Sequence, residues 1–248
     1  MPSLSVIVIT RNEAHNIAAC LASVDFADER IVLDAGSSDN TAELARIAGA
    51  KVVVSAEWPG FGPQKNRALA LAQGDWVLSI DADERVTPQL RGELRALLES
   101  APQQQVWFVP RKSSYCGQFM HHGGWYPDHV ARLFRRNQAR FSDDVVHEKL
   151  IFQGQAGYLQ NDLLHESFVN LESVLDKVNR YSTAGALALR QRGRSATLGQ
   201  AIAHGLWAFF RTYVLRGGFR DGRMGLVLAI SNAEGTYYRY LKLWLGDK

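Results

Sequence analysis

The stretch WVLSIDADERVTP, residues 76–88, passes from an apolar run to a group of acids within a few positions. Its first five residues are typical of a buried strand, and Asp81, Asp83 and Glu84 follow almost directly. Unpaired carboxylates repel one another and resist removal from water. They therefore point into solvent or lie beside a positive charge, and the rest of the sequence has to decide between these alternatives.

The chain on either side of this stretch alternates between short apolar runs and helical patterns. Strands are predicted over residues 4–9, 31–33, 52–54 and 76–80. Helices are predicted between them over residues 14–24, 41–48 and 65–73. Thr87 and Pro88 predict the cap and first turn of another helix. Strands and helices that alternate with short connections predict parallel strands joined by right-handed crossovers.

The pattern loosens after Pro102. Strands of mixed direction are predicted over residues 106–109, 130–134 and 145–151, and the chain is helical in pattern from Asn170 onward. We therefore expect an α/β fold with a mixed, mainly parallel sheet and a C-terminal helical extension. The expected division is an α/β domain over 1–168 and a basic, aromatic helical region over 169–248. The α/β domain is expected to have a regular half over about 1–100 and a less regular half over about 101–168.

Composition narrows the class of protein. A hydrophobic content of 46% with 21% charged residues is ordinary for a folded globular chain. The two cysteines, Cys20 and Cys116, form no CxxC pair, which argues against a disulfide scaffold or a cysteine zinc site and suits a reducing compartment. The N-terminal MPSLSVIVITRNE lacks the basic start and cleavage site of a signal peptide, so we expect a cytoplasmic protein.

Polar residues gather where the predicted parallel strands end. The first strand leads into Thr10-Arg11-Asn12-Glu13, the second into Asp34, and the fourth into Asp81-Ala82-Asp83. In parallel sheets ligands bind beyond these carboxyl ends. No GxGxxG or GxxxxGK[ST] loop occurs, so the charge of a bound phosphate has to be met by side chains and a metal. Two carboxylates one residue apart supply part of an oxygen shell for Mg²⁺ or Mn²⁺.

Four segments carry a family resemblance in their order and spacing: SVIVITRNE (5–13), VLDAGSSDNT (32–41), GPQKNRALALAQGDWVLSIDADE (62–84) and VHE (146–148). With these segments the chain resembles the family 2 glycosyltransferases, which have a GT-A fold, a Rossmann-like nucleotide-diphospho-sugar transferase fold. The segments DADERVTP and GGWYPDHVARLFRR, with the basic helical tail, resemble bacterial lipopolysaccharide core enzymes of the β-1,4-glucosyltransferase type.

The resemblance implies an inverting, metal-dependent enzyme that moves a hexose, glucose from UDP-glucose, onto a lipopolysaccharide inner-core or related lipid-linked glycan. It makes the α/β domain the catalytic domain, with its nucleotide half over about 1–100 and its acceptor half over about 101–168. It places seven residues at the nucleotide sugar: Thr10, Asn12, Glu13, Asp34, Lys65, Asp81 and Ala82. The metal is assigned to Asp83 and Asp81, with His165 as a third ligand. The family usually carries an acidic pair at the base. Here His147-Glu148 stands in that place, so Glu148 is assigned as the base and Asp144 as its substitute.

Some of these residues have a simpler interpretation from sequence alone. Lys65 could be a solvated lysine of a first helical turn, and His165 a hydrogen-bonded core histidine. The loop Gly123-Gly124-Trp125 could be a plain turn, although a glycine-rich loop with an aromatic residue also suits acceptor binding.

The C-terminal region is strongly basic. Between residues 190 and 223 there are seven arginines against one acid, Asp221, with aromatic residues interleaved. No apolar run there reaches the length of a spanning helix. Either these helices lie on an anionic membrane leaflet, on the inner face of the inner membrane, or they pack on the catalytic domain with arginines facing water. No nucleic-acid-binding module is recognised, so no nucleic-acid partner is expected.

Other functions fit the sequence less well. A sugar-nucleotide pyrophosphorylase would carry a glycine-rich basic loop after the first strand, where this chain has Thr10 to Glu13. A HAD-type phosphatase would carry its acids on the first strand, followed by a hydroxyl residue. A transferase of another surface polysaccharide or glycolipid pathway stays open, as does a membrane-associated scaffold without catalysis.

Overall fold

The computed structural model describes residues 2–144 and 148–246 and divides into two compact units. The sheet unit comprises Met1–Arg111 and Asp128–His165, and the helical unit comprises Lys112–Pro127 and Glu166–Lys248. This division differs from the expected boundary at residue 168, because the segment 112–127 groups with the C-terminal helices. Tyr115 and Met120 of that segment share one buried cluster with Val174 and Leu228.

The predicted parallel strands are confirmed. They are β1 (Leu4–Thr10), β2 (Glu29–Asp34), β3 (Lys51–Val54) and β4 (Trp76–Asp81). The pairings among these four strands are all parallel, in the spatial order β3-β2-β1-β4. The sheet then continues with β8 (Asp128–Arg135), β6 (Val106–Tyr115), β12 (Leu163–Phe168) and β5 (Glu84–Val86). Because β8 runs antiparallel to both β4 and β6, the sheet is mixed, as expected.

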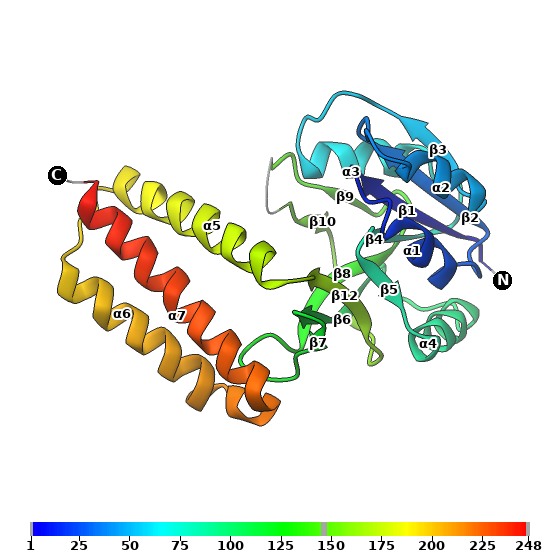
Figure 1. Ribbon diagram of the computed structural model, residues 1–248. Helices are drawn as coiled ribbons and strands as arrows, with labels where there is room; N and C mark the ends of the chain where they lie inside the picture. Colours follow the sequence, from blue (N-terminus) through cyan, green and yellow to red (C-terminus); the bar gives the residue numbers. More distant parts are fainter. Residues whose placement is uncertain (1, 145–147, 247–248) are drawn as a thin grey trace. The chain divides into compact units, whose positions relative to one another are not determined.

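Helices cover both faces of the parallel half (Figure 1). They are α1 (Ile17–Ser23), α2 (Thr41–Ile47), α3 (Phe61–Ala70) and α4 (Pro88–Glu99). Residues of α1, α2 and α4 share one core cluster with Val6 and Val8 of β1, whereas α3 shares the other with Ile7 and Ile9. Successive residues of a strand point to opposite faces, so β1 is buried on both sides and forms the centre of three layers.

Two elements differ from the sequence prediction. Helix α3 begins at Phe61, four residues before the predicted start, because Pro63 is tolerated in a first helical turn. Gly62 allows this start to pack closely, since a Cβ there would lie 1.8 Å from the carbonyl oxygen of Ser142. The short strand β5 was not predicted. It pairs antiparallel with β12 and places Glu84 opposite His165.

The remaining strands of the sheet unit are short. Strand β9 (Ala139–Phe141) pairs with β10 (Leu150–Phe152), and β11 (Gly157–Tyr158) pairs with β6. Of the strand predicted over 145–151, residues 145–147, and with them Val146 and His147 of the VHE segment, lie outside the described residues. Within the described part, only Leu150 and Ile151 of the predicted strand belong to one.

The helical unit consists mainly of α5 (Leu171–Gln191), α6 (Leu198–Phe210) and α7 (Gly222–Leu245), with β7 (Gln118–Phe119) paired to the end of β6. The predicted helical character after Asn170 is confirmed, and Asn170 caps α5. A Cβ on Gly205 of α6 would lie 3.1 Å from Tyr237 Cβ of α7, so a small residue lets these helices approach closely. Among the described residues, none of the helices is both long and apolar enough to cross a bilayer.

Candidate active site

A hollow of about 360 Å³ opens at the carboxyl ends of β1 and β4 in the sheet unit. It is lined by Ile9, Thr10, Arg11, Glu13, Trp58, Phe61, Asp81, Ala82, Asp83 and His165. Six of the predicted site residues are in this lining. The structure therefore brings residues from three distant parts of the chain to the edge of the sheet where parallel strands bind ligands.

The predicted residues Asn12 and Asp34 shape the loops beside the hollow rather than its wall. Asn12 has a φ of 57°, and its side-chain oxygen accepts a hydrogen bond from the Ser38 N–H at 2.8 Å. Asp34 is fully buried and accepts from the backbone N–H groups of Gly36 and Ser37 and from the Ser37 hydroxyl. These bonds fix the conformation of the loop after β2.

Thr10 and Glu13 present polar groups to the hollow. The Thr10 hydroxyl is buried and has no hydrogen-bond partner within the described chain. Glu13 accepts a hydrogen bond from the Asn16 side-chain amide at 2.9 Å, which leaves its second oxygen for other partners. A buried hydroxyl without a partner lowers stability unless a ligand or water satisfies it, so Thr10 points to a bound polar group.

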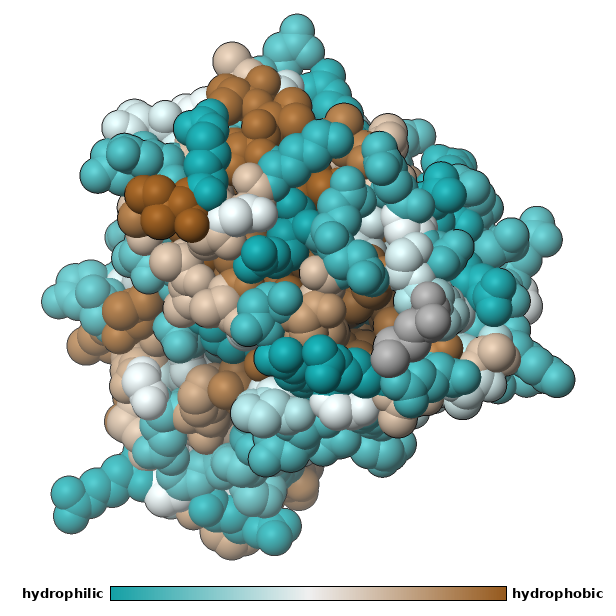
Figure 2. Space-filling view, turned by 90° about the vertical axis from the view of Figure 1, so that its right-hand side faces the viewer, coloured by the Kyte–Doolittle hydropathy of each residue, from teal (hydrophilic) through white to brown (hydrophobic). Residues whose placement is uncertain are grey.

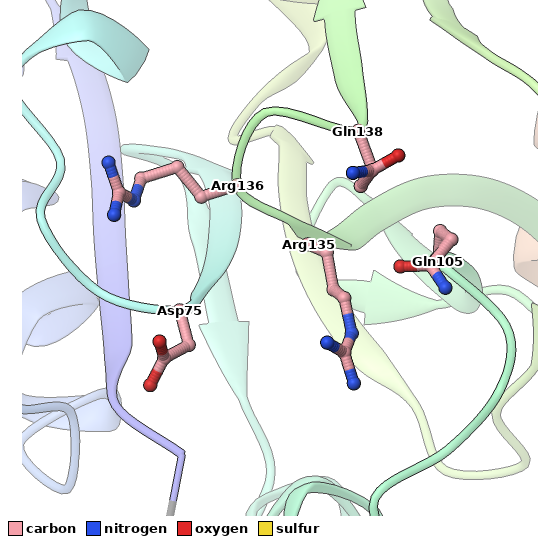
Figure 3. Close-up of a pocket in the computed structure, with 5 residues that line it drawn as sticks. All are labelled: Asp75, Gln105, Arg135, Arg136 and Gln138. Carbon is pink, nitrogen blue, oxygen red and sulfur yellow. The ribbon is translucent and has the colours of Figure 1, made fainter.

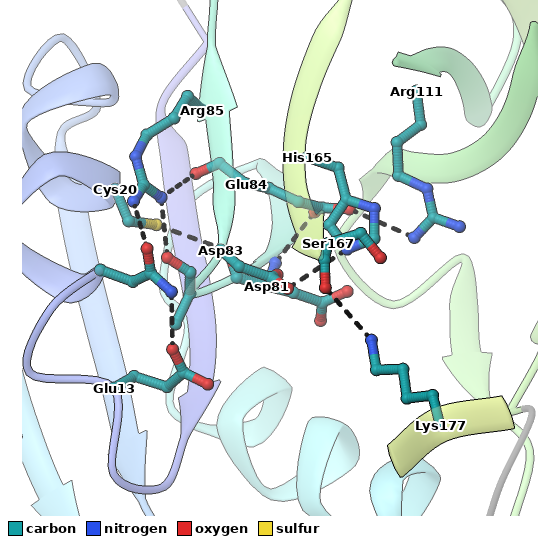
Figure 4. A network of polar contacts seen from close by, with 12 residues as sticks. Glu13, Cys20, Asp81, Asp83, Glu84, Arg85, Arg111, His165, Ser167 and Lys177 are labelled. Atoms are coloured by element: carbon teal, nitrogen blue, oxygen red, sulfur yellow. Dashed lines mark hydrogen bonds and ion pairs between the residues drawn. The ribbon is translucent and has the colours of Figure 1, made fainter. Parts of the chain in front are cut away.

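The acids after β4 lie beside the protein's own cations (Figure 4). The Arg132 guanidinium contacts both Asp81, at 2.5 Å, and Glu84, while Lys65 Nζ lies 3.1 Å from the other oxygen of Asp81. Arg132, Glu84 and Lys65 are all buried. The positive charge that the acids require is thus supplied in part by Arg132 of β8 and Lys65 of α3.

Burial and pairing shift the pKa values in this cluster in opposite directions. Burial alone would raise the pKa of Asp81, but Arg132 and Lys65 outweigh it and hold that pKa well below its usual range. Burial dominates at Glu84 and raises its pKa despite Arg132. The pKa of Arg132 is raised, because Asp81 and Glu84 outweigh the opposing effect of burial. The Asp81–Arg132 pair is therefore ionised at neutral pH.

Asp83 and His165 form a second pair at the wall of the hollow. His165 Nε2 lies 3.2 Å from Asp83 Oδ2, and the side chains are 15% and 29% exposed. A carboxylate oxygen and an imidazole nitrogen side by side fit a divalent cation whose other ligands are ligand oxygens and water. Asp81 fits a direct metal bond less well, because Lys65 and Arg132 each contact one of its oxygens.

The protein offers this cation a partial shell only. Among the described residues there is no group of three or more histidine, cysteine, aspartate and glutamate side chains that could hold a metal ion. A cation at Asp83 and His165 would depend on oxygens brought by a ligand. This suits a diphosphate, which arrives with several such oxygens.

The predicted base, Glu148, is linked to this cluster through Lys65. Lys65 Nζ donates a hydrogen bond to Glu148 Oε1 at 2.7 Å, so it bridges Glu148 and Asp81. The substitute base, Asp144, is exposed and accepts a hydrogen bond from the Ser142 hydroxyl. Only Glu148 of these two has a contact that leads to the residues after β4. Lys65 is buried, unlike the solvated lysine that sequence alone allowed.

The sequence assigned no site role to four residues that the structure places at the candidate active site, although Glu84 was among the acids of the stretch 76–88. Trp58 and Phe61 pack edge to face with ring centroids 5.0 Å apart, and both line the hollow although they are more than a third exposed. The signal was present in EWPGFGP, where two aromatic residues stand in an otherwise loop-like stretch. Arg132 and Glu84 are the other two. An arginine inside an apolar strand, between Val130 and Phe134, is itself a sign of a buried acid.

A second hollow of the sheet unit lies at the opposite strand ends (Figure 3). It has a volume of about 430 Å³ and is lined by Asp75, Gln105, Arg135, Arg136 and Gln138. Asp75 already accepts hydrogen bonds from the N–H and hydroxyl of Ser3, and Arg136 donates to the Gly74 carbonyl. It borders the start of β4, where parallel sheets do not bind their ligands, so we do not assign it to the reaction.

Two further observations concern the surface of the molecule and the place of the predicted acceptor loop. On the face shown in Figure 2, hydrophobic patches are interrupted by hydrophilic side chains. The predicted acceptor loop, Gly123, Gly124 and Trp125, belongs to the helical unit and lines a cavity of that unit.

Comparison with known proteins decides the family. The sequence profile of the family described as "Glycosyl transferase family 2" matches residues 5–163, more than half of the chain. The chain belongs to glycosyl transferase family 2. It is 30% identical to an uncharacterized glycosyltransferase of Rickettsia felis over 98% of this chain and 90% of that protein. The predicted family is confirmed, and the protein is a glycosyltransferase of the GT-A fold.

Two more similarities differ in how much of the chain they cover. The chain is 29% identical to the lipopolysaccharide core biosynthesis glycosyltransferase LpsC of Rhizobium meliloti, over 97% of this chain and 92% of that protein. A solved structure of glucosyl-3-phosphoglycerate synthase from Mycobacterium tuberculosis is 32% identical over 47% of this chain, with a TM-score of 0.38. The match spans 45% of that structure, less than half of its length.

Proposed function

We propose that this glycosyltransferase moves a hexose, glucose from UDP-glucose, onto a lipopolysaccharide inner-core or related lipid-linked glycan acceptor, with inversion at the sugar carbon. The observation that carries the proposal is the pairing of Asp83 with His165 in a hollow whose wall also holds the partnerless Thr10 hydroxyl. The similarity to LpsC supports the acceptor class. The preference for uridine rests on the family resemblance of the sequence motifs.

The proposed donor site uses the residues at the ends of β1, β2 and β4. Thr10, Glu13 and Ala82 would contact the nucleotide sugar, while Asn12 and Asp34 hold the loop beside it. The exposed pair Trp58 and Phe61 offers an aromatic surface for the flat base. Asp83 and His165 would hold Mg²⁺ or Mn²⁺, which when bound supplies a Lewis acid that neutralises charge on the departing diphosphate.

The proposed acceptor chemistry uses Glu148. Its carboxylate would take the proton of an acceptor hydroxyl as that oxygen attacks the sugar carbon from the side opposite the diphosphate. A single displacement of this kind inverts the configuration, by the same logic as in inverting glycosidases. Lys65 keeps Glu148 and Asp81 in place through its two contacts, and we propose it as a positioning residue. Asp144 is the alternative base.

The proposed division of labour assigns the donor site and the catalytic base to the sheet unit, and membrane contacts to the helical unit. On α6 the small residues Ala201, Gly205 and Ala208 are buried, whereas the large apolar Leu198, Ile202 and Leu206 are exposed. This arrangement differs from an ordinary amphipathic helix, in which the large residues are covered.

An anionic leaflet is the partner that matches this surface. Exposed leucine, isoleucine and aromatic side chains can enter the acyl boundary, while exposed arginines that line no cavity, Arg220 and Arg223, meet anionic headgroups. We therefore propose a cytoplasmic, peripheral protein on the inner face of the inner membrane. Co-sedimentation of the full chain with vesicles tests this: L206Q/W207Q should weaken binding to anionic vesicles, and equal binding by this variant and the unchanged chain would reject it.

The first test of the reaction is calorimetric titration of the purified protein with UDP, with and without Mn²⁺, beside ADP and GDP. Binding of UDP only in the presence of metal would support the proposed donor and justify assays with UDP-sugars and core acceptors. Binding of another nucleotide would keep the reaction class and reject the donor. Absence of binding to all three nucleotides would reject the assigned site.

A further inference from the structure

The helical unit contains an open cavity of about 400 Å³ that the donor site does not use. Its wall comes from α5, the end of α6, α7 and the loop that contains Gly123, Gly124 and Trp125. Four of its lining side chains are cationic: Lys177, Arg211, Arg216 and Arg239. None of the lining residues is an aspartate or a glutamate. A cavity lined by one sign of charge concentrates its field on whatever enters it.

Close packing defines where two of these arginines lie. A Cβ on Gly124 would lie 2.5 Å from Arg216 Nη1, and the φ of Gly124 is +81°, which only glycine adopts readily. A Cβ on Gly185 of α5 would lie 2.7 Å from Arg239 Nε. Each arginine thus lies across a position without a side chain. The sequence places glycine where it allows a guanidinium to reach the cavity.

A carboxylate near this cavity is Glu234 of α7, which acts electrostatically on Tyr115 but forms no ion pair with the arginines among the described residues. In the part of the chain that the structure describes, Arg211, Arg216 and Arg239 form no ion pair with a carboxylate. The one acid between residues 190 and 223, Asp221, is buried and contacts His122 Nδ1 at 2.7 Å, with further bonds from the N–H groups of His121 and His122. Like charges gathered without a partner repel, so an anion would stabilise the arrangement.

An aromatic wall faces the same cavity. Tyr115, Trp125 and Phe168 pack together with ring centroids 5.6 to 5.8 Å apart, and Lys177 Nζ lies 4.2 Å above the Phe168 ring. Buried hydroxyl groups complete the lining: Tyr115 and Ser231 share a hydrogen bond of 2.6 Å. Pockets that combine aromatic side chains with a few placed polar groups are typical of small-molecule sites.

We propose that this cavity binds a phosphate group carried by a sugar, and that it anchors the phosphorylated part of the acceptor. Guanidinium groups match phosphate oxygens with paired hydrogen bonds, and the aromatic wall offers a flat apolar face to the sugar ring. Identification with the acceptor rests on the proposed function, whereas binding of a sugar phosphate does not. The loop Gly123-Gly124-Trp125 then has two roles: Gly124 leaves room for the Arg216 side chain, and Trp125 lines the cavity.

The test is calorimetric titration of the full chain with glucose 6-phosphate, glucose, inorganic phosphate and monomeric dihexanoylphosphatidate. We expect glucose 6-phosphate to bind, inorganic phosphate to bind more weakly and glucose not to bind. In R211Q/R239Q the affinity for glucose 6-phosphate should fall at least about tenfold, because two charge-assisted contacts are lost. The matched control is R192Q/R194Q, which removes two exposed arginines of the same unit that do not line the cavity. If R211Q/R239Q unfolds, the single variant R239Q replaces it.

Each outcome bears on the proposal. Equal loss in both double variants would show that general surface charge binds the phosphate, which overturns the inference. Binding of dihexanoylphosphatidate without glucose 6-phosphate would assign the phosphate to a lipid headgroup and reject the sugar. No binding of any phosphate ester at millimolar concentration also rejects it. The same variants titrated with UDP and Mn²⁺ keep the two proposals apart, since R211Q/R239Q should retain donor binding.

Discussion

The two charged sites of this protein differ in how their charges are balanced. After β4, Arg132 and Lys65 each contact two carboxylates; Glu84 and both cations are buried, while Asp81 and Glu148 are partly exposed. In the helical unit, three arginines that form no ion pair among the described residues line a cavity that no carboxylate lines. A balanced, buried network keeps its geometry without a ligand, whereas an unbalanced and open cluster gains most when an anion arrives.

The comparison explains why Asp83 is the exception among the acids. Asp81 and Glu84 face Arg132, whereas Asp83 contacts His165, whose ring nitrogen is of a type that binds metals. The network of Asp81, Glu84, Arg132 and Lys65 is therefore a rigid support. The Asp83–His165 pair beside it is the part that can respond to a ligand. The largest effects of substitution on turnover should therefore come from Asp83 and from Glu148, the proposed catalytic base.

Replacement of Asp83 should have the largest effect on turnover. D83A removes the carboxylate that we assign to the cation, so transfer should fall by about 10³-fold or more, since Lewis-acid stabilisation is worth several kcal/mol. Because the side chain is part-exposed, the thermal unfolding midpoint should change little. A rate assay with UDP-glucose across Mn²⁺ concentrations measures this. D143A, which removes an exposed acid, is the control, and equal rates in both variants would contradict the assignment.

Replacement of Glu148 should separate binding from chemistry. E148Q keeps the shape of the side chain but cannot accept a proton, so transfer should fall by about 10²- to 10⁴-fold while UDP binding is retained. Calorimetry and a rate assay on one preparation measure the two quantities. Near-normal turnover would move the base elsewhere, and D144N would then be expected to lose activity.

Much of the sheet unit could be predicted because its strands obey a simple pattern. The runs at β1, β2 and β4 are apolar throughout, as strands buried on both faces are, and their polar ends coincide with the carboxyl edge. The GT-A fold and family followed from these segments. Strand β5 escaped prediction because two of its three residues, Glu84 and Arg85, are charged, and its partner β12 lies about 80 positions further along the chain.

The partners within the site could not be predicted for a similar reason. Which cation meets Asp81 and Glu84 depends on the register between β4 and β8, where Leu78 faces Leu133 and Arg132 follows on. A single sequence does not specify that register. The sequence marked the loop Gly123-Gly124-Trp125 by its glycines, and its role in acceptor binding stays a prediction. The reason for Gly124 is visible only in three dimensions, where Arg216 occupies the space that a side chain would need.

Stability should distinguish the balanced site from the unbalanced one. R132M removes the guanidinium that contacts both buried Glu84 and part-exposed Asp81, and leaves Glu84 with Arg111 at 3.5 Å and Asp81 with Lys65 at 3.1 Å, so unfolding should become easier by about 3 kcal/mol. R211Q removes an exposed charge that has no carboxylate partner, and its effect should stay within about 0.5 kcal/mol. Urea denaturation of both variants measures the difference. Equal destabilisation would show that the buried network contributes no more than an exposed surface charge.

The two cysteines, one in each unit, allow a comparison in which the expected effects on stability and reactivity are the smallest. Burial raises the pKa of Cys20 to about 12 from a model-peptide value near 9.0. Because the folded pKa is the higher one, the thiol's contribution to stability is complete below pH 9 and is lost as the pH rises toward 12. The advantage of the unchanged chain over C20A in urea should therefore shrink between pH 8 and pH 10.5.

Alkylation offers an independent measure of the same contrast. Cys116 is partly exposed, so iodoacetamide at pH 8 should modify it in the folded protein well before Cys20, which is fully buried and protonated. In urea both thiols should react at similar rates. Mass spectrometry of peptides after timed quenching gives both rates. Rapid modification of Cys20 in the folded state would mean that the core around α1 opens readily. The charged network after β4 could then no longer be described as rigid.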